Sequence, residues 1–408
     1  MYTCDKNRVD EKIKAFSQFG ATSGGGITRF ALSKECLQAR DYFVKRMKAA
    51  GATIETDDMA NVYATLPGSE PGLLRIATGS HCDSVRKGGN YDGILGVIGA
   101  MEAIEAIADQ KIPHRHPITA MIWTNEEGAQ HPPSLMGSGV ISGKFDKDTM
   151  LASKGASGLT FAQALEASGY KGEEKNRFAS SDYKANIELH IEQGPVLDAE
   201  GKDVGVVPCV LGMVNYRIKA FGQSEHAGTT PMKFRRDALY AAAQALIYLH
   251  EELDKLDPAL VYTTGEVVCR PCIHTVIPEY VDFSIDARHE DPAVIAQVVD
   301  IITNKLPGEF AGCRIETQKM WGRETVYFNK DLVAAVQKYA DGFGYSNMRI
   351  NSGAGHDAQF TASLVPTTMI FVPSKDGHSH CEEEFTSLEQ CWQGTNILLN
   401  TILEVDGM

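Results

Sequence analysis

A strand, a buried helix and a second strand follow one another between residues 73 and 124, and this order restricts the fold more than any other feature. Residues 73–78 form an apolar run typical of a strand, and 93–108 are small and apolar enough for a buried helix. Residues 118–124 form a second buried strand. This alternation predicts an α/β core with a largely parallel sheet. A chain of 408 residues has room for two or three domains of ordinary size.

The pattern changes near residue 213. Five segments that read as strand or helix follow: a strand at 214–221, a helix at 235–255, strands at 261–269 and 280–288, and a helix at 293–305. Their order predicts a smaller α+β domain of βαββαβ type, inserted over residues 213–327. Residues 1–212 and 328–408 would then form the larger domain. The long helix 235–255 could cover either its own sheet or a dimer partner, and we favour the sheet.

Further elements of the larger domain are expected along the rest of the chain. They are a helix at 33–50, a hairpin at 52–66, a strand at 186–191, a helix at 330–342, a strand at 367–372 and a helix at 387–403. Residues 1–32 give no functional signal, and the glycine-rich segment 23–26 predicts a flexible loop.

Charge and composition exclude several classes of protein. The chain has 39 Lys and Arg against 53 Asp and Glu, a net charge of −14, which disfavours nucleic acid as a partner. No apolar run reaches the roughly 18 residues of a membrane span. The polar first residues lack the apolar region of a signal peptide, so we expect a cytoplasmic protein.

The cysteine pattern agrees with that location. The chain contains nine cysteines at irregular spacings, which favours reduced thiols over a disulfide framework. Cys269 and Cys272 form a CxxC motif that could indicate redox or zinc chemistry. Because no second CxxC is present and the motif lies in a strand-like run, we favour a structural role.

Side chains suited to metal ions follow the predicted strands, where ligands bind in open α/β sheets. His81 and Asp83 are two residues apart on an extended segment and point the same way. The Asp83 carboxylate can therefore accept the second N–H of His81, as is usual for a metal-bound imidazole. Asp92 follows a glycine-bearing loop at the start of the next helix, where a carboxylate can bridge two ions.

Other candidates follow later strands. Glu126 and Glu127 come after strand 118–124 and face opposite ways, so that one can bind metal while the other acts as a base. The remaining candidates are histidines in or after predicted strands and in glycine-rich turns: His190, His356, His378 and His380. Taken singly, each has an ordinary structural interpretation as a turn, core or loop residue. Taken together, they meet the needs of a two-metal hydrolytic site, in which ions about 3.5–4 Å apart activate water and polarise a carbonyl.

The donor types and the missing motifs narrow the chemistry. Nitrogen and oxygen ligands without thiolate suit Zn²⁺, Mn²⁺ or Co²⁺. The sequence contains no HExxH zincin motif, no GxSxG nucleophile motif and no Walker A loop. These absences disfavour a zincin, a serine hydrolase of the α/β type and a P-loop nucleotide-binding protein.

Six motifs together resemble the zinc-dependent amidohydrolases of the carboxypeptidase and aminoacylase clan. They are GSHCDSV…GGNYDG, EEG, ELHIEQGP, HAGTTPM…RRDA, SGAGHDA and DGHSH. The resemblance runs from about residue 20 to 400 and is greatest to the N-carbamoyl-L-amino acid hydrolases, allantoate amidohydrolases and β-ureidopropionases. HAGTTPM is the marker of this branch. The resemblance implies a di-metal, exopeptidase-like catalytic domain with an inserted lid and dimerisation domain.

The resemblance also assigns the metal ligands. His81, Asp92 and His190 would hold one divalent ion, and Asp92 would bridge to a second ion. Glu127 and His380 would complete that second set, with His380 rather than His378 matching the last histidine of the family. Glu126 would be the general base and acid, and Asp83 would orient His81.

Substrate contacts are carried over in the same way. His226 in the inserted domain would hold the substrate and its oxyanion, and Arg288 would bind the substrate carboxylate in a two-pronged contact. Gln193 and His356 would line the pocket, as would Thr275. The implied partners are a small-molecule carboxylate substrate and a second copy bound through the inserted domain, giving a homodimer.

The sequence departs from the family at several of these places. Thr275 stands where the family usually has asparagine, and Glu279 stands where it has glycine. Gln130 and His131 replace an Arg-Phe pair, and residues 213–215 replace a polar or basic pair. The ligand set is complete, so the departures concern the substrate rather than hydrolysis itself.

These observations lead to one main hypothesis and two alternatives. The chain would cleave the ureido C–N bond of N-carbamoyl-L-amino acids or a related ureido acid such as allantoate or β-ureidopropionate. One alternative keeps the scaffold but acts as an N-acyl-amino acid deacylase or dipeptidase. The other, a metal-containing binding protein with an inactive site, is disfavoured because Glu126 and the ligand set are intact.

Overall fold

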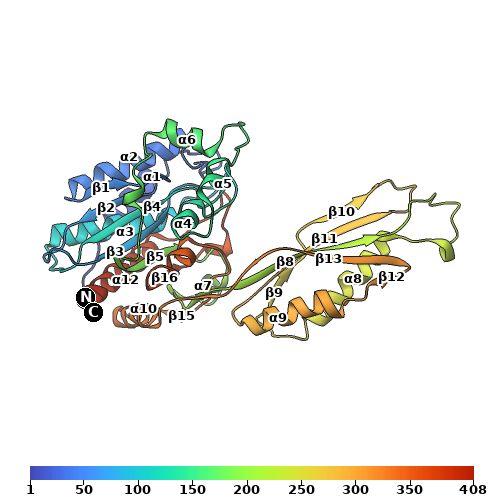
Figure 1. The fold of residues 1–408 in the computed structure, drawn as a ribbon. Helices are drawn as coiled ribbons and strands as arrows, with labels where there is room; N and C mark the ends of the chain where they lie inside the picture. The colour runs from blue at the N-terminus through green and yellow to red at the C-terminus, as the bar shows by residue number, and fades with distance from the viewer. The chain divides into compact units, whose positions relative to one another are not determined.

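The computed structural model describes residues 1–408 and contains two compact units. Unit 1 comprises Met1–Pro208 and Tyr327–Met408, and unit 2 comprises Cys209–Val326. Each unit has its own sheet and its own helices (Figure 1). The expected boundaries, 212/213 and 327/328, lie within a few residues of the boundaries of these units. Two short strands, β7 (Cys209–Val210) and β14 (Val326–Tyr327), pair with each other where the chain passes between the units.

Unit 1 is built on an eight-stranded mixed sheet in the order β1-β2-β4-β3-β5-β16-β6-β15. The strands are β1 (Thr53–Thr56), β2 (Val62–Leu66), β3 (Arg75–His81), β4 (Ile118–Trp123), β5 (Tyr183–Ile191), β6 (Val204–Val207), β15 (Asn347–Arg349) and β16 (Thr367–Val372). The four central strands β4, β3, β5 and β16 are mutually parallel. Their carboxyl ends therefore meet at one edge of the sheet, where α/β proteins place their ligands.

Helices complete unit 1. The longer helices are α1 (Lys6–Phe16), α2 (Lys34–Ala49), α3 (Ile94–Gln110), α10 (Lys330–Phe343) and α12 (Leu388–Gly407). The shorter helices are α4 (Met136–Ile141), α5 (Lys147–Leu151), α6 (Phe161–Ser168), α7 (Val196–Ala199) and α11 (Asp357–Thr361). Helix α3 is buried from Ile94 to Ile107 because it contacts strands β3, β4 and β5 as well as helices α1 and α12. This confirms the expectation of a buried helix between two strands.

Unit 2 contains an antiparallel sheet in the order β10-β11-β8-β13-β12, with β9 paired to β11. The strands are β8 (Gly212–Phe221), β9 (Val261–Thr263), β10 (Val267–Arg270), β11 (Tyr280–His289), β12 (Glu309–Phe310) and β13 (Cys313–Arg323). The expected single strand at 261–269 is wrong. Residues 264–266 interrupt it, and β9 and β10 pair with different parts of β11.

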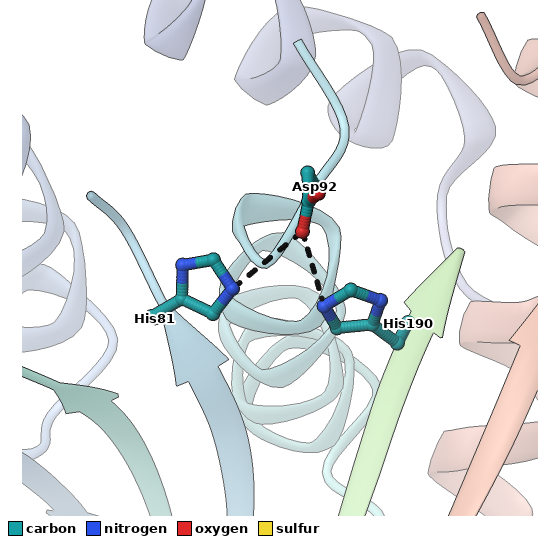
Figure 2. Close-up of side chains that lie close together, drawn as sticks. All are labelled: His81, Asp92 and His190. Atoms are coloured by element: carbon teal, nitrogen blue, oxygen red, sulfur yellow. Dashed lines mark ion pairs between the residues drawn. The ribbon is translucent and has the colours of Figure 1, made fainter. Parts of the chain in front are cut away.

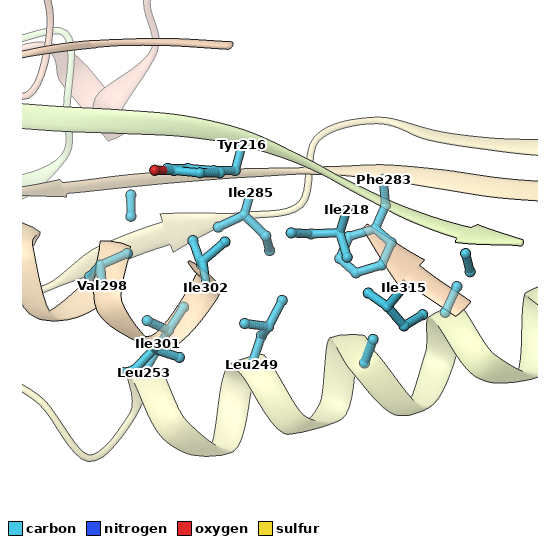
Figure 3. Close-up of a cluster of buried hydrophobic side chains, with 14 of the residues drawn as sticks. Tyr216, Ile218, Leu249, Leu253, Phe283, Ile285, Val298, Ile301, Ile302 and Ile315 are labelled. Atoms are coloured by element: carbon cyan, nitrogen blue, oxygen red, sulfur yellow. The ribbon is translucent and has the colours of Figure 1, made fainter. Parts of the chain in front are cut away.

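Two helices cover one face of this sheet. They are α8 (Ala238–Leu253) and α9 (Pro292–Asp300), the latter continuing into a π-helical turn at Ile301–Lys305. Leu249 and Leu253 of α8 pack against the strand residues Ile218, Phe283 and Ile285 in one buried cluster (Figure 3). The inner face of the long helix thus packs on its own sheet, as the sequence predicted.

Two general features of the chain bear on its class. None of the helices combines the length and the hydropathy needed to cross a membrane. All nine cysteines are free thiols. Cys269 lies in β10, and Cys272 is exposed in the turn that follows.

Candidate metal centre

Two histidines on neighbouring parallel strands face one carboxylate oxygen (Figure 2). His81 is the last residue of β3, and His190 lies near the end of β5. Their Nε2 atoms are 3.6 Å and 3.4 Å from Oδ1 of Asp92, which comes from the loop before α3. All three side chains are buried. The three ligand atoms converge closely enough for a single ion.

The other oxygen of Asp92 faces a second group. Nε2 of His380 lies 3.2 Å from Oδ2 of Asp92 and 3.5 Å from Oε2 of Glu127. Asp92 therefore presents one oxygen to each group of ligands. This is the arrangement expected of a carboxylate that bridges two ions.

The main chain fixes both buried imidazoles. Nδ1 of His81 lies 3.0 Å from the carbonyl oxygen of Asp83, and Nδ1 of His190 lies 2.9 Å from that of Ile191. Since a carbonyl oxygen only accepts hydrogen bonds, each Nδ1 carries a hydrogen and each Nε2 is the atom that faces Asp92. The ring of His81 has room because Gly93 lacks a side chain. A Cβ on Gly93 would lie 2.2 Å from Cε1 of that ring.

The role expected for the Asp83 side chain needs correction. Its carboxylate does not accept the Nδ1 hydrogen of His81, because the carbonyl oxygen of the same residue takes that position. The carboxylate instead accepts the main-chain N–H groups of Glu126 and Glu127, at 3.3 Å and 3.2 Å. Asp83 thus fixes the turn that carries the two glutamates.

Glu126 lies beside the first group without joining it. Its Oε2 is 3.6 Å from Nε2 of His81. Burial raises the pKa of Glu126 well above its usual value, even though the His81 imidazole acts in the opposite direction. Burial and the nearby Asp92 raise the pKa of Glu127 to about 8. The two adjacent glutamates therefore occupy different positions, one in a ligand group and one next to it.

Two oxygens of the buried acids have no hydrogen-bond partner in the protein. Although burial raises it, the imidazoles of His380 and His81 hold the pKa of Asp92 well below its usual range. Oδ1 of Asp92 and Oε1 of Glu127 are nevertheless buried without a hydrogen-bond partner. Unpaired buried acceptors are costly, and divalent cations would satisfy them. The residues present thus fit two ions of the Zn²⁺, Mn²⁺ or Co²⁺ type.

Strained backbone gathers at the same place. Asn125, Gln193 and His380 have φ values of 58°, 60° and 57°, which non-glycine residues rarely adopt. Asn125 precedes Glu126, and the amide of Gln193 donates to Oδ2 of Asp92 at 2.8 Å. Such conformations cost of order 1 kcal/mol each and concentrate at functional sites.

His356 lies next to the first ligand group. Its ring packs edge-on against His190 with 4.5 Å between ring centroids, and its Nε2 is 2.8 Å from the Ser352 hydroxyl. Glu188, His190 and His356 also lie close enough together to form a third potential ligand group. Both oxygens of Glu188 are already occupied, by the Ser80 hydroxyl at 2.7 Å and the Ala358 N–H at 2.9 Å. The third group is therefore less available to a metal ion than the other two.

Comparison with known proteins identifies the family of this chain. The family described as peptidase family M20/M25/M40 matches residues 77–404. This chain belongs to that family. It is 33% identical to an N-carbamoyl-L-amino-acid amidohydrolase of Paenarthrobacter aurescens over 404 residues, 98% of each chain. It is 35% identical to the allantoate amidohydrolase of Escherichia coli (strain K12), covering 98% of this chain and 97% of that one.

Solved structures extend the comparison to the fold of this M20 protein. A hydantoinase/carbamoylase family amidase from Burkholderia multivorans has a TM-score of 0.92 and 37% identity, covering 100% of this chain and 99% of that one. The mixed α/β fold with two domains expected from the sequence is therefore confirmed.

Three predicted substrate residues of the M20 protein lie in unit 2. The main-chain N–H groups of Gly228 and Thr229 donate to Nδ1 of His226, at 2.9 Å and 3.2 Å. The hydrogen of that imidazole is thus on Nε2, which is available as a donor. The Thr275 carbonyl accepts the Ala227 N–H at 2.9 Å, so Thr275 adjoins the His226 turn. Arg288 lies on β11, and its Nε donates to Asp286 at 2.7 Å.

The departures from the family pattern have structural explanations in part. His131 is buried and packs against Phe161 with 5.6 Å between ring centroids, and burial lowers its pKa. Its carbonyl accepts the side-chain amide of Asn125 at 2.7 Å, which supports the turn before Glu126. The Glu279 carbonyl accepts the Gly222 N–H at 2.8 Å, a contact that any residue can make.

Sequence reasoning missed two buried glutamates of the M20 site, Glu188 and Glu384. Glu188 is two residues before His190 on the same strand, a spacing that could have indicated it. Burial and the nearby Asp92 raise the pKa of Glu384 to about 7. Glu384 follows His380 by four residues in an irregular segment, where no periodicity marks it.

Proposed function

We propose that this M20 protein is a metal-dependent amidohydrolase that cleaves the ureido C–N bond of an N-carbamoyl-L-amino acid or a related ureido acid such as allantoate or β-ureidopropionate. The observation that carries the proposal is the shared carboxylate: Asp92 turns one oxygen to His81 and His190 and the other to His380. Glu126 lies beside this centre, with its Oε2 3.6 Å from Nε2 of His81. The ureido substrate class is supported by relatives named N-carbamoyl-L-amino-acid amidohydrolase and allantoate amidohydrolase.

The ligands proposed for two divalent ions are His81, Asp92 and His190 for one, and Asp92, Glu127 and His380 for the other. When bound, such ions polarise the substrate carbonyl and lower the pKa of water. Glu126 takes a proton from the attacking water and delivers it to the leaving nitrogen. Burial supports this role of Glu126 because it raises the pKa of the carboxyl group, which can then hold the proton between the two steps.

Unit 2 supplies the contacts to the substrate oxyanion and carboxylate in this proposal. Nε2 of His226 donates a hydrogen bond to the oxygen on which negative charge develops. The Arg288 guanidinium binds the substrate carboxylate through two parallel hydrogen bonds. Gln193 and His356 of unit 1 line the pocket, and Thr275 adjoins His226.

An assembly and a location complete the proposal. Leu239, Tyr240 and Ile247 are large apolar side chains exposed on the outer face of α8, which supports a homodimer formed through unit 2. An Ile247→Glu substitution should then yield monomers in analytical ultracentrifugation. We also propose a cytoplasmic location, which the nine free thiols support.

A panel of substrates tests the reaction. Metal-loaded protein is incubated with allantoate, N-carbamoyl-L-amino acids and β-ureidopropionate, beside N-acetyl-amino acids and dipeptides, and both ammonia and free amine are measured. Ammonia from a ureido substrate, lost in Glu126→Gln, supports the proposal. Free amine without ammonia would instead support the deacylase or dipeptidase alternative. The departures from the family pattern at Thr275 and Gln130 are the sequence features that favour this alternative.

A further inference from the structure

Glu384 is buried behind Asp92, with only 3% of its surface exposed. Its Oε1 accepts two consecutive main-chain N–H groups, from Tyr91 at 2.9 Å and from Asp92 at 3.0 Å. These amides lie just before Gly93, the N-cap residue of α3. One carboxylate oxygen thus fixes the backbone that carries the shared ligand of both metal groups.

The second oxygen of Glu384 reaches the other side of the centre. Oε2 lies 3.2 Å from the hydroxyl of Ser379, the residue before His380. The same hydroxyl lies 3.1 Å from Oδ2 of Asp92. A hydroxyl has one hydrogen and donates to one carboxylate at a time. When Oδ2 of Asp92 faces a cation, the hydrogen of Ser379 is available to Glu384, which then holds the segment leading into His380.

The loop before Asp92 is shaped to admit Glu384. A Cβ on Gly89 would lie 2.1 Å from Cδ and from Oε1 of Glu384, so any side chain at this position would displace the carboxylate. The same loop is tied to the glycine-rich segment 23–26 and to Ile27, which follows it. The Asn90 amide donates to the Gly25 carbonyl at 2.8 Å, and the Ile27 N–H donates to the Gly88 carbonyl at 2.9 Å. These bonds tie the 88–92 loop to the segment that the sequence predicted to be a flexible loop.

We propose that Glu384 is a positioning residue of the metal centre, which sets the place of Asp92 directly and that of His380 through Ser379. This inference rests on the proposed metal-dependent function. Oε1 of Glu384 accepts two main-chain N–H groups and Oε2 faces the Ser379 hydroxyl, so the carboxylate acts on the ligands rather than on the ions. Carboxylates that orient metal ligands typically change metal affinity by about 10–100-fold when they are removed.

Two substitutions and one control test the role in the full-length protein. Glu384→Ala removes all three hydrogen bonds, whereas Glu384→Gln keeps a carbonyl oxygen for the two main-chain amides. Glu383→Ala is the matched control, because Glu383 is the adjacent glutamate and is exposed. Zn²⁺ affinity is measured by competition with a chromogenic chelator, and the ligand field is measured by visible absorption of the Co²⁺-loaded protein.

We expect Glu384→Ala to bind at least one Zn²⁺ ion about 100-fold more weakly and to alter the Co²⁺ absorption bands. Glu384→Gln should weaken binding about tenfold, because a neutral amide accepts the two N–H groups less strongly. Glu383→Ala should match the wild type in both measurements. A folded Glu384→Ala protein with wild-type affinity and spectrum would overturn the inference. If Glu384→Ala does not fold, wild-type behaviour of Glu384→Gln would overturn it.

The outcome is separable from that of the proposed function. If the wild type binds two ions and Glu384→Ala binds them weakly, the positioning role stands even when no ureido substrate releases ammonia. If the wild type hydrolyses a ureido acid while Glu384→Ala keeps full metal affinity, the proposed function stands and the positioning role fails.

Discussion

Nδ1 of His81 lies 3.0 Å from the main-chain oxygen of Asp83, so Asp83 holds this imidazole with its backbone rather than with its side chain. The carboxylate is thereby left to accept the amides of Glu126 and Glu127. Asp83 alone thus fixes both a candidate metal ligand and the turn after β4. These separate roles of the Asp83 backbone and side chain can be tested.

Substituting Asp83 by asparagine should affect the glutamate turn and leave His81 in place. The amide offers one acceptor where the carboxylate offers two, so one N–H of the turn loses its partner. We expect kcat to fall by about 10–100-fold. ¹⁵N NMR of the histidines should show the same His81 tautomer as in the wild type. A changed tautomer would mean that the side chain of Asp83 does orient the imidazole.

Removing the metal should destabilise the protein. Ions that bind only the folded state add about 2.7 kcal/mol at a concentration one hundred times their Kd. We expect a chelator to lower the melting temperature of the wild type. The chelator should have less effect on His190→Ala, which lacks a ligand of the first group, and metal analysis should find fewer ions in that variant. Equal effects of the chelator on both proteins would contradict the assignment of His190.

His226→Ala tests the donor proposed for the oxyanion. Removing one such donor typically lowers kcat by about 10²–10³-fold. Because His226 belongs to no ligand group, we expect the metal content to stay at the wild-type level. A rise in KM with unchanged kcat would instead show that His226 only helps to bind the substrate.

A buried ionic network should stabilise unit 1. Nζ of Lys12 lies 2.7 Å from Glu102 and 2.6 Å from Glu105, and the Lys12 and Glu102 side chains are fully buried. Arg8 also contacts Glu102, at 2.7 Å. Glu102→Ala would leave the buried Lys12 with one carboxylate fewer, and losing a partner from a buried pair costs about 3–5 kcal/mol.

Urea unfolding should show this loss as a lower midpoint. The control is Lys14→Ala, which removes the exposed pair of Lys14 with Asp10 and should leave the midpoint unchanged. A Glu102→Ala protein as stable as the wild type would mean that this network adds no net stability to unit 1.

Local pattern predicts the central sheet and the candidate ligands, whereas their division into two groups came from the resemblance to the amidohydrolases. Each of β3, β4, β5 and β16 is buried along almost all of its length, and the polar residues at their carboxyl ends meet at one edge because the strands are parallel. His81, His190 and Glu127 could therefore be placed together from their positions after or within strands. Asp92 could be placed by its position at the start of α3.

Features that depend on distant partners could not be predicted in this way. Helix α1 has a charged residue, Lys12, on its buried face, so its sequence does not show which face is buried. The partners of Lys12, Glu102 and Glu105, lie about ninety residues away. Glu384 likewise acts on amides that precede it by almost three hundred residues. Whether the backbone or the side chain of Asp83 accepts the Nδ1 hydrogen of His81 depends on the geometry of a turn, which residue spacing does not specify.

In the proposed reaction, the Asp92-centred site hydrolyses a ureido bond with Glu126 as the base. The most direct test measures ammonia release and metal content together, in the wild type and in Glu126→Gln, with an N-carbamoyl-L-amino acid or allantoate as substrate. We predict that the wild type releases ammonia, and that Glu126→Gln binds the same number of ions but turns over at least about 10²-fold more slowly. Equal turnover in the two proteins, or loss of an ion from Glu126→Gln, would contradict the role of Glu126. A metal-loaded wild type that releases no ammonia from any ureido acid would contradict the proposed reaction.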